Sequence, residues 1–130
     1  MIVLDASAAV EFLLDLQAGA AVAARVSVAG ETMHAPHLLD AEVTHALRRY
    51  TLRGEITPTR GREALEDLAA LRLRRYSHVR LLPRMWELRA NLSGYDAAYV
   101  ALAEALDAPL LTTDRALARA PGHRATIELA

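Results

Sequence analysis

The sequence predicts a three-layer α/β/α sandwich, in which helices cover both faces of a mainly parallel central sheet. Short apolar runs alternate along the chain with longer segments of helical periodicity, as is typical of parallel α/β folds. The pattern is clearest in residues 96–111, where an almost wholly apolar helix precedes a short apolar strand. The 130 residues, 53% of them hydrophobic, suffice for one core, so we expect a single domain over residues 1–130.

The first part of the chain predicts two strands with two helices between them. Residues 2–4 form an apolar run that fits a strand, and residues 8–14 have the spacing of a helix. Residues 15–29 are rich in alanine and predict a second helix, which is weakened by Gly19 and ends at a glycine. A brief strand is expected at residues 32–35, before a proline.

The middle of the chain predicts three helices and one weak strand. Residues 37–53 place apolar side chains on one helical face, and a glycine ends this helix. The next helix starts at Thr57, since proline follows it and proline favours the first helical position. Its predicted buried side consists of Ala64, Leu65, Leu68, Ala69 and Leu71. Residues 75–79 are a weak strand candidate, and residues 82–92 predict another helix.

The last part of the chain predicts two helices and two strands. Asp96 opens a helix with little polar surface, which we expect to be buried against the sheet and to stop before Pro109. Residues 110–111 form an apolar run suited to an interior strand. A short helix is expected at residues 115–119, and a last strand at residues 125–129 after a Pro-Gly turn.

The composition excludes several classes of site. The chain has no cysteine, which rules out disulfides and thiolate metal ligands and is compatible with a reducing cytoplasm. All 15 basic residues are arginine, and the absence of lysine argues against a P-loop and against Schiff-base chemistry. The chain starts without the basic segment of a signal peptide, and no apolar run approaches the ~20 residues of a membrane span. We therefore expect a cytoplasmic protein with no membrane segment.

Positive charge is concentrated in the middle of the chain. The net charge of the protein is −1, but residues 48–89 contain 11 arginines and five acids. This local surplus fits contacts with nucleic-acid phosphates, and it fits solvated helix faces equally well. Charge patterning alone does not separate the two interpretations.

Four acidic residues stand at element ends where a site can form. Asp5 follows the first strand, Asp114 lies just past the strand at residues 110–111, and Asp96 begins the apolar helix. Glu42 lies at the edge of an apolar helix face, where it can point into a cleft. Functional crevices of parallel sheets lie at the carboxyl ends of the strands, so these acids can converge there. Taken singly, Asp96 also fits a helix-start acid and Asp114 a helix cap.

A cluster of these four carboxylates predicts a bound divalent cation. Carboxylates gathered in a cleft repel one another and raise each other's pKa unless a cation neutralises them. Hard oxygen ligands, without cysteine or clustered histidine, favour Mg²⁺ or Mn²⁺ over Zn²⁺. Ser7 and Thr112 are placed to hydrogen-bond the carboxylates or metal-bound water, and they also fit ordinary caps and strand-end hydroxyls.

Three segments resemble a known family in its own order along the chain. They are VLDASAAVEFLL near the start, APHLLDAEVTHALRR in the middle and YDAAYVALAEALDAPLLTTDRALA near the end. With them the sequence resembles the PIN-domain ribonucleases, and more closely the VapC-type toxins of bacterial toxin-antitoxin pairs. The resemblance spans most of the chain, so it is more specific than any one acid.

The resemblance implies a site, an activity and partners. It assigns metal binding to Asp5, Glu42, Asp96 and Asp114, with Ser7 and Thr112 nearby. It implies a Mg²⁺- or Mn²⁺-dependent endoribonuclease that cleaves cellular RNA, often tRNA or ribosomal RNA. It further implies a homodimer that a VapB-type antitoxin neutralises. One departure is His45, about one helical turn after Glu42, where many relatives carry asparagine.

Two other functions are compatible with parts of the sequence. A receiver-like signalling domain phosphorylated on Asp5 fits the size and the α/β alternation, but such domains usually bring a lysine to the phosphoryl group and this chain has none. A non-catalytic PIN module that binds RNA or protein fits the same resemblance. The intact set of four acids argues against it.

Overall fold

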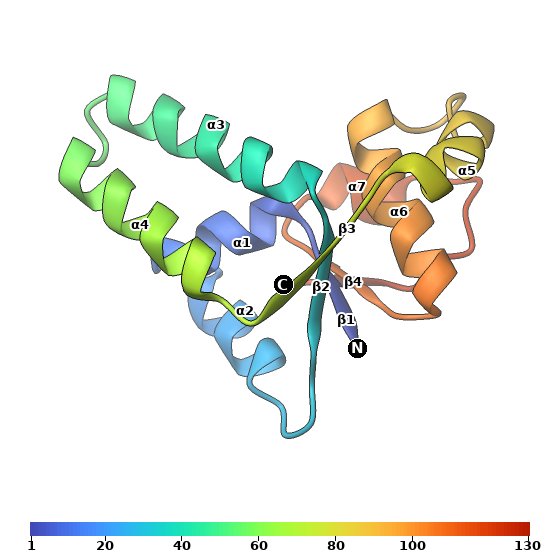
Figure 1. Ribbon diagram of the computed structural model, residues 1–130, viewed down its shortest axis with the longest axis horizontal. Helices are drawn as coiled ribbons and strands as arrows, with labels where there is room; N and C mark the ends of the chain where they lie inside the picture. The colour runs from blue at the N-terminus through green and yellow to red at the C-terminus, as the bar shows by residue number, and fades with distance from the viewer.

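The computed structural model describes residues 1–130 and places five strands in one sheet with helices against both faces (Figure 1). The strands are β1 (Ile2–Leu4), β2 (Met33–Pro36), β3 (Leu73–Tyr76), β4 (Leu110–Thr112) and β5 (Ile127–Leu129). Every pairing between neighbouring strands is parallel. The predicted α/β/α sandwich with a mainly parallel sheet is therefore confirmed.

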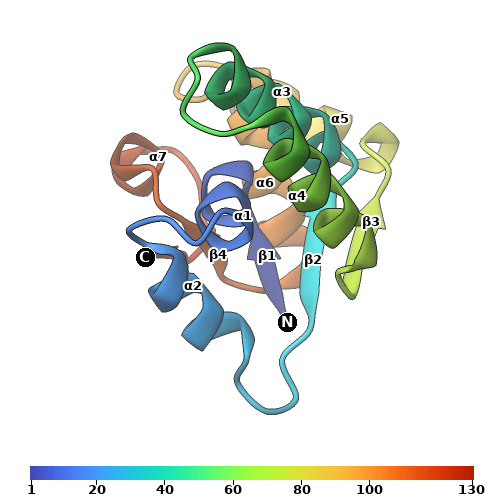
Figure 2. The ribbon, with the colours of Figure 1, turned by 90° about the vertical axis from the view of Figure 1, so that its left-hand side faces the viewer.

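The helices form the two outer layers. They are α1 (Ala6–Leu13), α2 (Gly19–Val26), α3 (Leu38–Leu52), α4 (Pro58–Ala70), the 3₁₀ segment η1 (Val79–Leu81), α5 (Leu82–Glu87), α6 (Gly94–Leu106) and α7 (Arg115–Arg119). Helices α1 to α4 lie on one side of the sheet, and α5 and α6 lie on the other (Figures 1 and 2). None of these helices combines the length and the apolar character that crossing a bilayer requires.

The order of the strands fixes where a site can form. The strand order in the sheet is β3-β2-β1-β4-β5. The chain adds β2 and β3 on one side of β1, and then adds β4 and β5 on the other side. The connections that leave the carboxyl ends of β1 and β4 run in opposite directions, and a crevice forms between them. The register pairs Leu4 with Leu111, so Asp5 and Thr112 follow on adjacent strands at this switch point.

Helix α6 is the most buried helix of the fold. Seven consecutive residues of this helix, Ala97–Ala103, are all buried, and the helix packs against β1, β2 and β4. The predicted buried helix is thus confirmed, but its ends differ by a few residues. It begins at Gly94, because the Ser93 side chain accepts a hydrogen bond from the Asp96 backbone N–H. It ends at Leu106, because the left-handed backbone of Asp107 (φ 49°) stops the helix before Pro109.

Helix α2 starts four residues later than the sequence predicts. The Ala18 backbone N–H donates to the Glu11 carboxylate at 2.8 Å, and Asp15 has a left-handed backbone with φ of 51°. The turn therefore folds back onto α1 before α2 begins at Gly19. A Cβ atom at Gly19 would lie 2.6 Å from the Glu11 carbonyl oxygen, so this glycine permits the close approach and is not a weak point within a helix.

Other boundaries shift for similar reasons. The weak strand predicted at residues 75–79 is β3 at Leu73–Tyr76, and residues 79–81 form η1 instead. The helix predicted at residues 82–92 ends at Glu87. Ala69, predicted on the buried side of α4, is exposed, whereas Ala64 and Leu68 are buried as predicted. The last strand begins at Ile127, two residues after its predicted start.

Candidate active site

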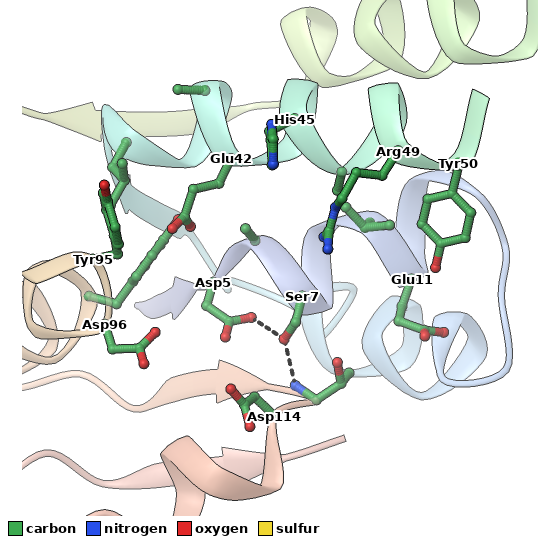
Figure 3. A pocket seen from close by; sticks show the side chains of 17 residues that line it. Asp5, Ser7, Glu11, Glu42, His45, Arg49, Tyr50, Tyr95, Asp96 and Asp114 are labelled. Carbon is green, nitrogen blue, oxygen red and sulfur yellow. Dashed lines mark hydrogen bonds between the residues drawn. The ribbon is translucent and has the colours of Figure 1, made fainter. Parts of the chain in front are cut away.

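A cleft of about 720 Å³ lies at the carboxyl ends of β1 and β4, between α1, α3 and the start of α6 (Figure 3). The structure brings together in its lining the four acids singled out by the sequence, which are Asp5, Glu42, Asp96 and Asp114. Ser7 and His45 line the same cleft. Thr112 is fully buried directly beneath Asp5, to which it donates a hydrogen bond.

Asp5 is the most firmly held of the four acids. It is 6% exposed and caps α1, because its Oδ1 accepts from the Ala8 backbone N–H at 2.9 Å. The Ser7 hydroxyl donates to the same oxygen at 2.7 Å, and the Thr112 hydroxyl donates to Oδ2 at 2.5 Å. These three donors fix the orientation of the carboxylate at the base of the cleft.

The two hydroxyls also join the end of β1 to the loop after β4. Ser7 Oγ accepts from the Thr113 backbone N–H at 3.0 Å, and Thr112 Oγ1 accepts from the Asp114 backbone N–H at 2.9 Å. Each hydroxyl therefore donates to Asp5 and accepts from the segment that carries Asp114. The positions of these two acids are coupled by short, partly buried contacts.

Thr112→Val should lower the free energy of unfolding by about 1–3 kcal/mol, because the valine leaves the Asp114 N–H without its acceptor and Asp5 without one donor. Urea denaturation followed by circular dichroism measures the change. Thr113→Val is the matched control, since the Thr113 hydroxyl makes no hydrogen bond in the structure. Equal stability of the two variants would contradict the coupling.

Glu42 reaches the cleft from α3 and meets a partner on α6. Its Oε2 accepts a hydrogen bond of 2.6 Å from the hydroxyl of Tyr99, a side chain that is 2% exposed. Sequence reasoning missed Tyr99. The signal available was its position three residues after Asp96, which places both side chains on one face of α6.

Asp96 and Asp114 occupy element starts. Asp96 is half-buried in the first turn of α6. Asp114 is exposed and caps α7, since its Oδ1 accepts from the backbone N–H groups of Ala116 and Leu117 at 2.8 and 3.4 Å. The alternative interpretation of Asp114 as a helix cap is therefore correct, and the capping residue also lines the cleft.

The four acids have no cationic partner in the protein. None of the ion pairs of the structure includes Asp5, Glu42, Asp96 or Asp114. Burial raises the pKa of Asp5, Glu42 and Asp96 above the ordinary range, and repulsion adds to it: Asp96 acts on Asp5 and Glu42, and Asp114 acts on Asp96. Neutralising this cluster requires either protons or a bound cation.

The donor set fits a hard divalent cation. Its ligands are carboxylate oxygens, with hydroxyls around them and no thiolate, which suits Mg²⁺ or Mn²⁺. As the side chains stand, no three acidic or histidine side chains surround one point closely enough to hold an ion.

In protein freed of divalent ions, Glu42 should make the folded state less stable as pH rises. Burial raises the pKa of Glu42 above its value of about 4.3 in an unfolded chain. The folded state keeps this proton to higher pH than the unfolded state does. The resulting stabilisation is complete below about pH 4.3 and is lost as pH rises through the raised pKa.

Urea denaturation in EDTA, from about pH 4 to pH 7, should therefore show the parent losing stability relative to Glu42→Gln. Acids whose pKa is lowered in the folded state gain stability as pH rises; one is Glu31, whose pKa Arg25 lowers to about 2. Both proteins contain these acids, so their contribution cancels when the stability of the variant is subtracted from that of the parent. A difference that stays constant or grows in favour of the parent would contradict the raised pKa.

The cleft extends well beyond the four acids. Glu11, Arg49 and Tyr50 line one end, and Tyr95 lines the other (Figure 3). His45, where the sequence departs from the family pattern, also lines the cleft, but sequence reasoning did not single out Glu11, Arg49, Tyr50 or Tyr95. They come from α1, α3 and α6, and only the packing of these helices brings their side chains to one cavity.

Comparison with known proteins identifies relatives over nearly the whole chain. The PIN-domain family model matches residues 2–123. Ribonuclease VapC9 of Mycobacterium tuberculosis is 50% identical over 88% of this chain and 86% of its own. Ribonuclease VapC1 of the same organism is 48% identical over 98% of this chain and 96% of its own.

Solved structures share the fold at low sequence identity. VapBC2 from Rickettsia felis, bound to a DNA fragment from its promoter, superposes with a TM-score of 0.74 at 16% identity, over 100% of this chain and 99% of that one. M. tuberculosis VapC20, described as a toxin that cleaves the sarcin-ricin loop, gives a TM-score of 0.71 at 13% identity, over 91% and 93% of the two chains.

Proposed function

This chain belongs to the PIN-domain family, among the VapC ribonucleases, and we propose that it is an endoribonuclease that depends on Mg²⁺ or Mn²⁺ and acts through Asp5, Glu42, Asp96 and Asp114. One observation carries the site assignment: the four carboxylates line a single cleft at the switch point of the sheet and have no cationic partner in the protein. The receiver-like alternative is wrong, because the chain is a PIN domain over nearly its whole length.

We assign different roles to the residues of the cleft. Asp5 supplies a fixed carboxylate at its base, and Tyr99 orients Glu42 from the opposite helix. Asp96 and Asp114 add carboxylates from the starts of α6 and α7. A divalent ion held by these acids would polarise a phosphodiester and lower the pKa of water that it binds. Ser7 and Thr112 keep the geometry of Asp5 through the reaction.

The activity is tested with purified protein and total cellular RNA. Cleavage in Mn²⁺ or Mg²⁺, and its loss in EDTA, is the expected result. Tight RNA binding without cleavage under either ion would favour the non-catalytic module instead. We propose tRNA or ribosomal RNA as the target, and mapping new RNA ends after controlled expression would name it.

Family membership supports a proposal about two partners. We propose that a VapB-type antitoxin neutralises this chain and that the chain forms a homodimer. The R. felis relative was crystallised as VapBC2 with promoter DNA, which supports the antitoxin for the present chain. Light scattering on the purified protein tests the dimer, and copurification with the product of an adjacent reading frame tests the antitoxin.

Tyr99→Phe should weaken metal-dependent cleavage by about 10- to 100-fold, the usual cost of removing a group that orients a metal ligand. The phenylalanine keeps the buried ring and removes only the hydroxyl that holds Glu42. Isothermal titration with Mn²⁺ should show weaker binding. Tyr76→Phe is the control, because the Tyr76 hydroxyl bonds His34 outside the cleft. Unchanged Mn²⁺ affinity in Tyr99→Phe would contradict this role.

A further inference from the structure

Arg49 is the only arginine that lines the cleft. The other charged side chains in the lining are acidic, so this guanidinium is the single permanent positive charge facing a strongly negative cavity. Figure 3 shows it pointing from α3 toward α1, at the end of the cleft away from Asp96. A basic group at this position attracts an anion to a place where the acids repel one.

Arg49 has no partner within the protein. It makes no ion pair and no side-chain hydrogen bond, whereas Arg75 and Arg84 each hold a carboxylate through two nitrogens. Glu11 lies across the cleft from it, but its carboxylate accepts from the Ala18 backbone N–H at 2.8 Å. The five donors of the Arg49 guanidinium are therefore available for a ligand.

The spacing along α3 relates Arg49 to the proposed metal site. Glu42, His45 and Arg49 project from one face of α3 into the cleft (Figure 3). Seven residues separate Glu42 from Arg49, which is about 10 Å along the helix axis. A phosphate at Arg49 would thus be a different phosphate from the one at the acids, and both would belong to one strand that follows the cleft.

The opposite end of the cleft offers an aromatic surface. Tyr95 is 64% exposed, lines the cleft and stands beside Asp96, with the acids between it and Arg49 (Figure 3). Channels for single-stranded nucleic acid combine basic groups that follow the backbone with aromatic side chains on which bases stack. This cleft has one of each, placed on the two sides of the acids.

We propose that single-stranded RNA lies along this cleft, with Arg49 holding a phosphate beyond the scissile one and Tyr95 stacking a base on the other side of the acids. The proposal rests on the ribonuclease function proposed above and adds the path of the substrate. Duplex RNA does not fit this path, because its bases are stacked within the helix and unavailable to Tyr95.

The test measures binding of a short fluorescein-labelled single-stranded RNA of mixed sequence by anisotropy, at several KCl concentrations in Mn²⁺. Asp96→Asn is present in every protein to prevent cleavage. Each phosphate contact contributes about 0.7 to the slope of log K against log salt for single strands. Arg49→Gln should weaken binding and reduce this slope by about 0.7, whereas Tyr95→Ala should weaken binding about 5-fold or more with the slope unchanged.

Matched variants separate these contacts from general effects. Arg48→Gln removes a neighbouring exposed arginine of α3 that does not line the cleft, and it should leave affinity and slope as in the parent. Tyr95→Phe keeps the ring that stacks, and it should restore most of the binding that Tyr95→Ala loses. An unchanged slope in Arg49→Gln, or an equal change in Arg48→Gln, would overturn the Arg49 contact.

Failure of the inference and failure of the proposed function are distinguishable. The protein without Asp96→Asn is incubated with total RNA and Mn²⁺ in parallel. If it cleaves RNA while Arg49→Gln and Tyr95→Ala bind as the parent does, the path is wrong and the ribonuclease assignment stands. If it cleaves no RNA, the proposed function fails and this inference fails with it.

Discussion

Asp96→Asn should lower RNA cleavage by about 100-fold or more, since even groups that merely orient metal ligands are worth about 10- to 100-fold. The substitution removes a carboxylate that is half-buried, carries a raised pKa and has no cationic partner in the protein. It preserves the size of the side chain, and the cap of α6 uses the backbone N–H of residue 96, which the variant retains. Cleavage should therefore fall without loss of the fold.

The measurement is the initial rate of cleavage of total RNA at fixed Mn²⁺, with the thermal midpoint of each protein recorded beside it. Asp67→Asn is a suitable control, because Asp67 is an exposed acid of α4 that does not line the cleft and has no ion pair. Cleavage by Asp96→Asn at the rate of the parent would show that the site assignment is wrong.

The sequence predicted the frame of this site because the frame depends on element ends. An apolar run marks β1, and parallel strands bring their carboxyl ends to one edge, so Asp5 could be placed before the structure was known. Asp96 at a helix start and Glu42 at the edge of a helix face were candidates for the same reason, and the resemblance of three separate segments to one family then assigned metal binding to all four acids. Chain order and strand polarity carry this information, and both are visible in a sequence.

The contacts that hold the side chains in place were not predictable in the same way. Tyr99 and Glu42 are 57 residues apart, and their hydrogen bond depends on how α3 and α6 face each other across the cleft. The late start of α2 depends on a tertiary contact, because Glu11 of α1 binds the backbone at Ala18. Sequence patterns within one element do not indicate contacts between residues that are far apart in the chain.

The arginine-rich middle segment shows how structure resolves an ambiguous charge pattern. Four of its eleven arginines form ion pairs, which are Arg60, Arg62, Arg75 and Arg84. Arg74 and Arg89 lie over the rings of Tyr76 and Trp86. Only Arg49 lines the cleft. Most arginines of this segment therefore do not face the site. Their solvated or paired side chains agree with the interpretation of the segment as solvated helix faces.

Helix α6 links the stability of the fold to the geometry of the site. Its first turn carries Asp96, its second carries Tyr99, and its buried residues pack against the central strands. A displacement of this helix moves one proposed metal ligand and the side chain that orients another. Damage to its packing should therefore affect cleavage, even where the altered residue touches neither acid.

Ala101→Asp should lower the thermal midpoint by about 10 °C or more. The rate of cleavage should fall in proportion to the fraction of protein that is unfolded. Ala101 is 2% exposed within α6, so the aspartate would bury a carboxyl group without a partner at a cost of several kcal/mol. That cost is a large part of the about 5–15 kcal/mol that stabilises a domain of this kind. Thermal denaturation followed by circular dichroism, with cleavage assayed on the same samples, measures both effects.

Ala105→Asp provides the matched comparison, because it introduces the same side chain on the exposed face of the same helix. Both variants lose the same alanine helix propensity, and Ala105→Asp lies in the last turn of α6, where the helix dipole disfavours an acid, so a larger loss in Ala101→Asp is due to burial. We expect Ala105→Asp to stay close to the parent in thermal midpoint and cleavage rate. If Ala101→Asp were equally stable and active, α6 would be less tightly packed than the structure shows, and the site would not depend on it for its geometry.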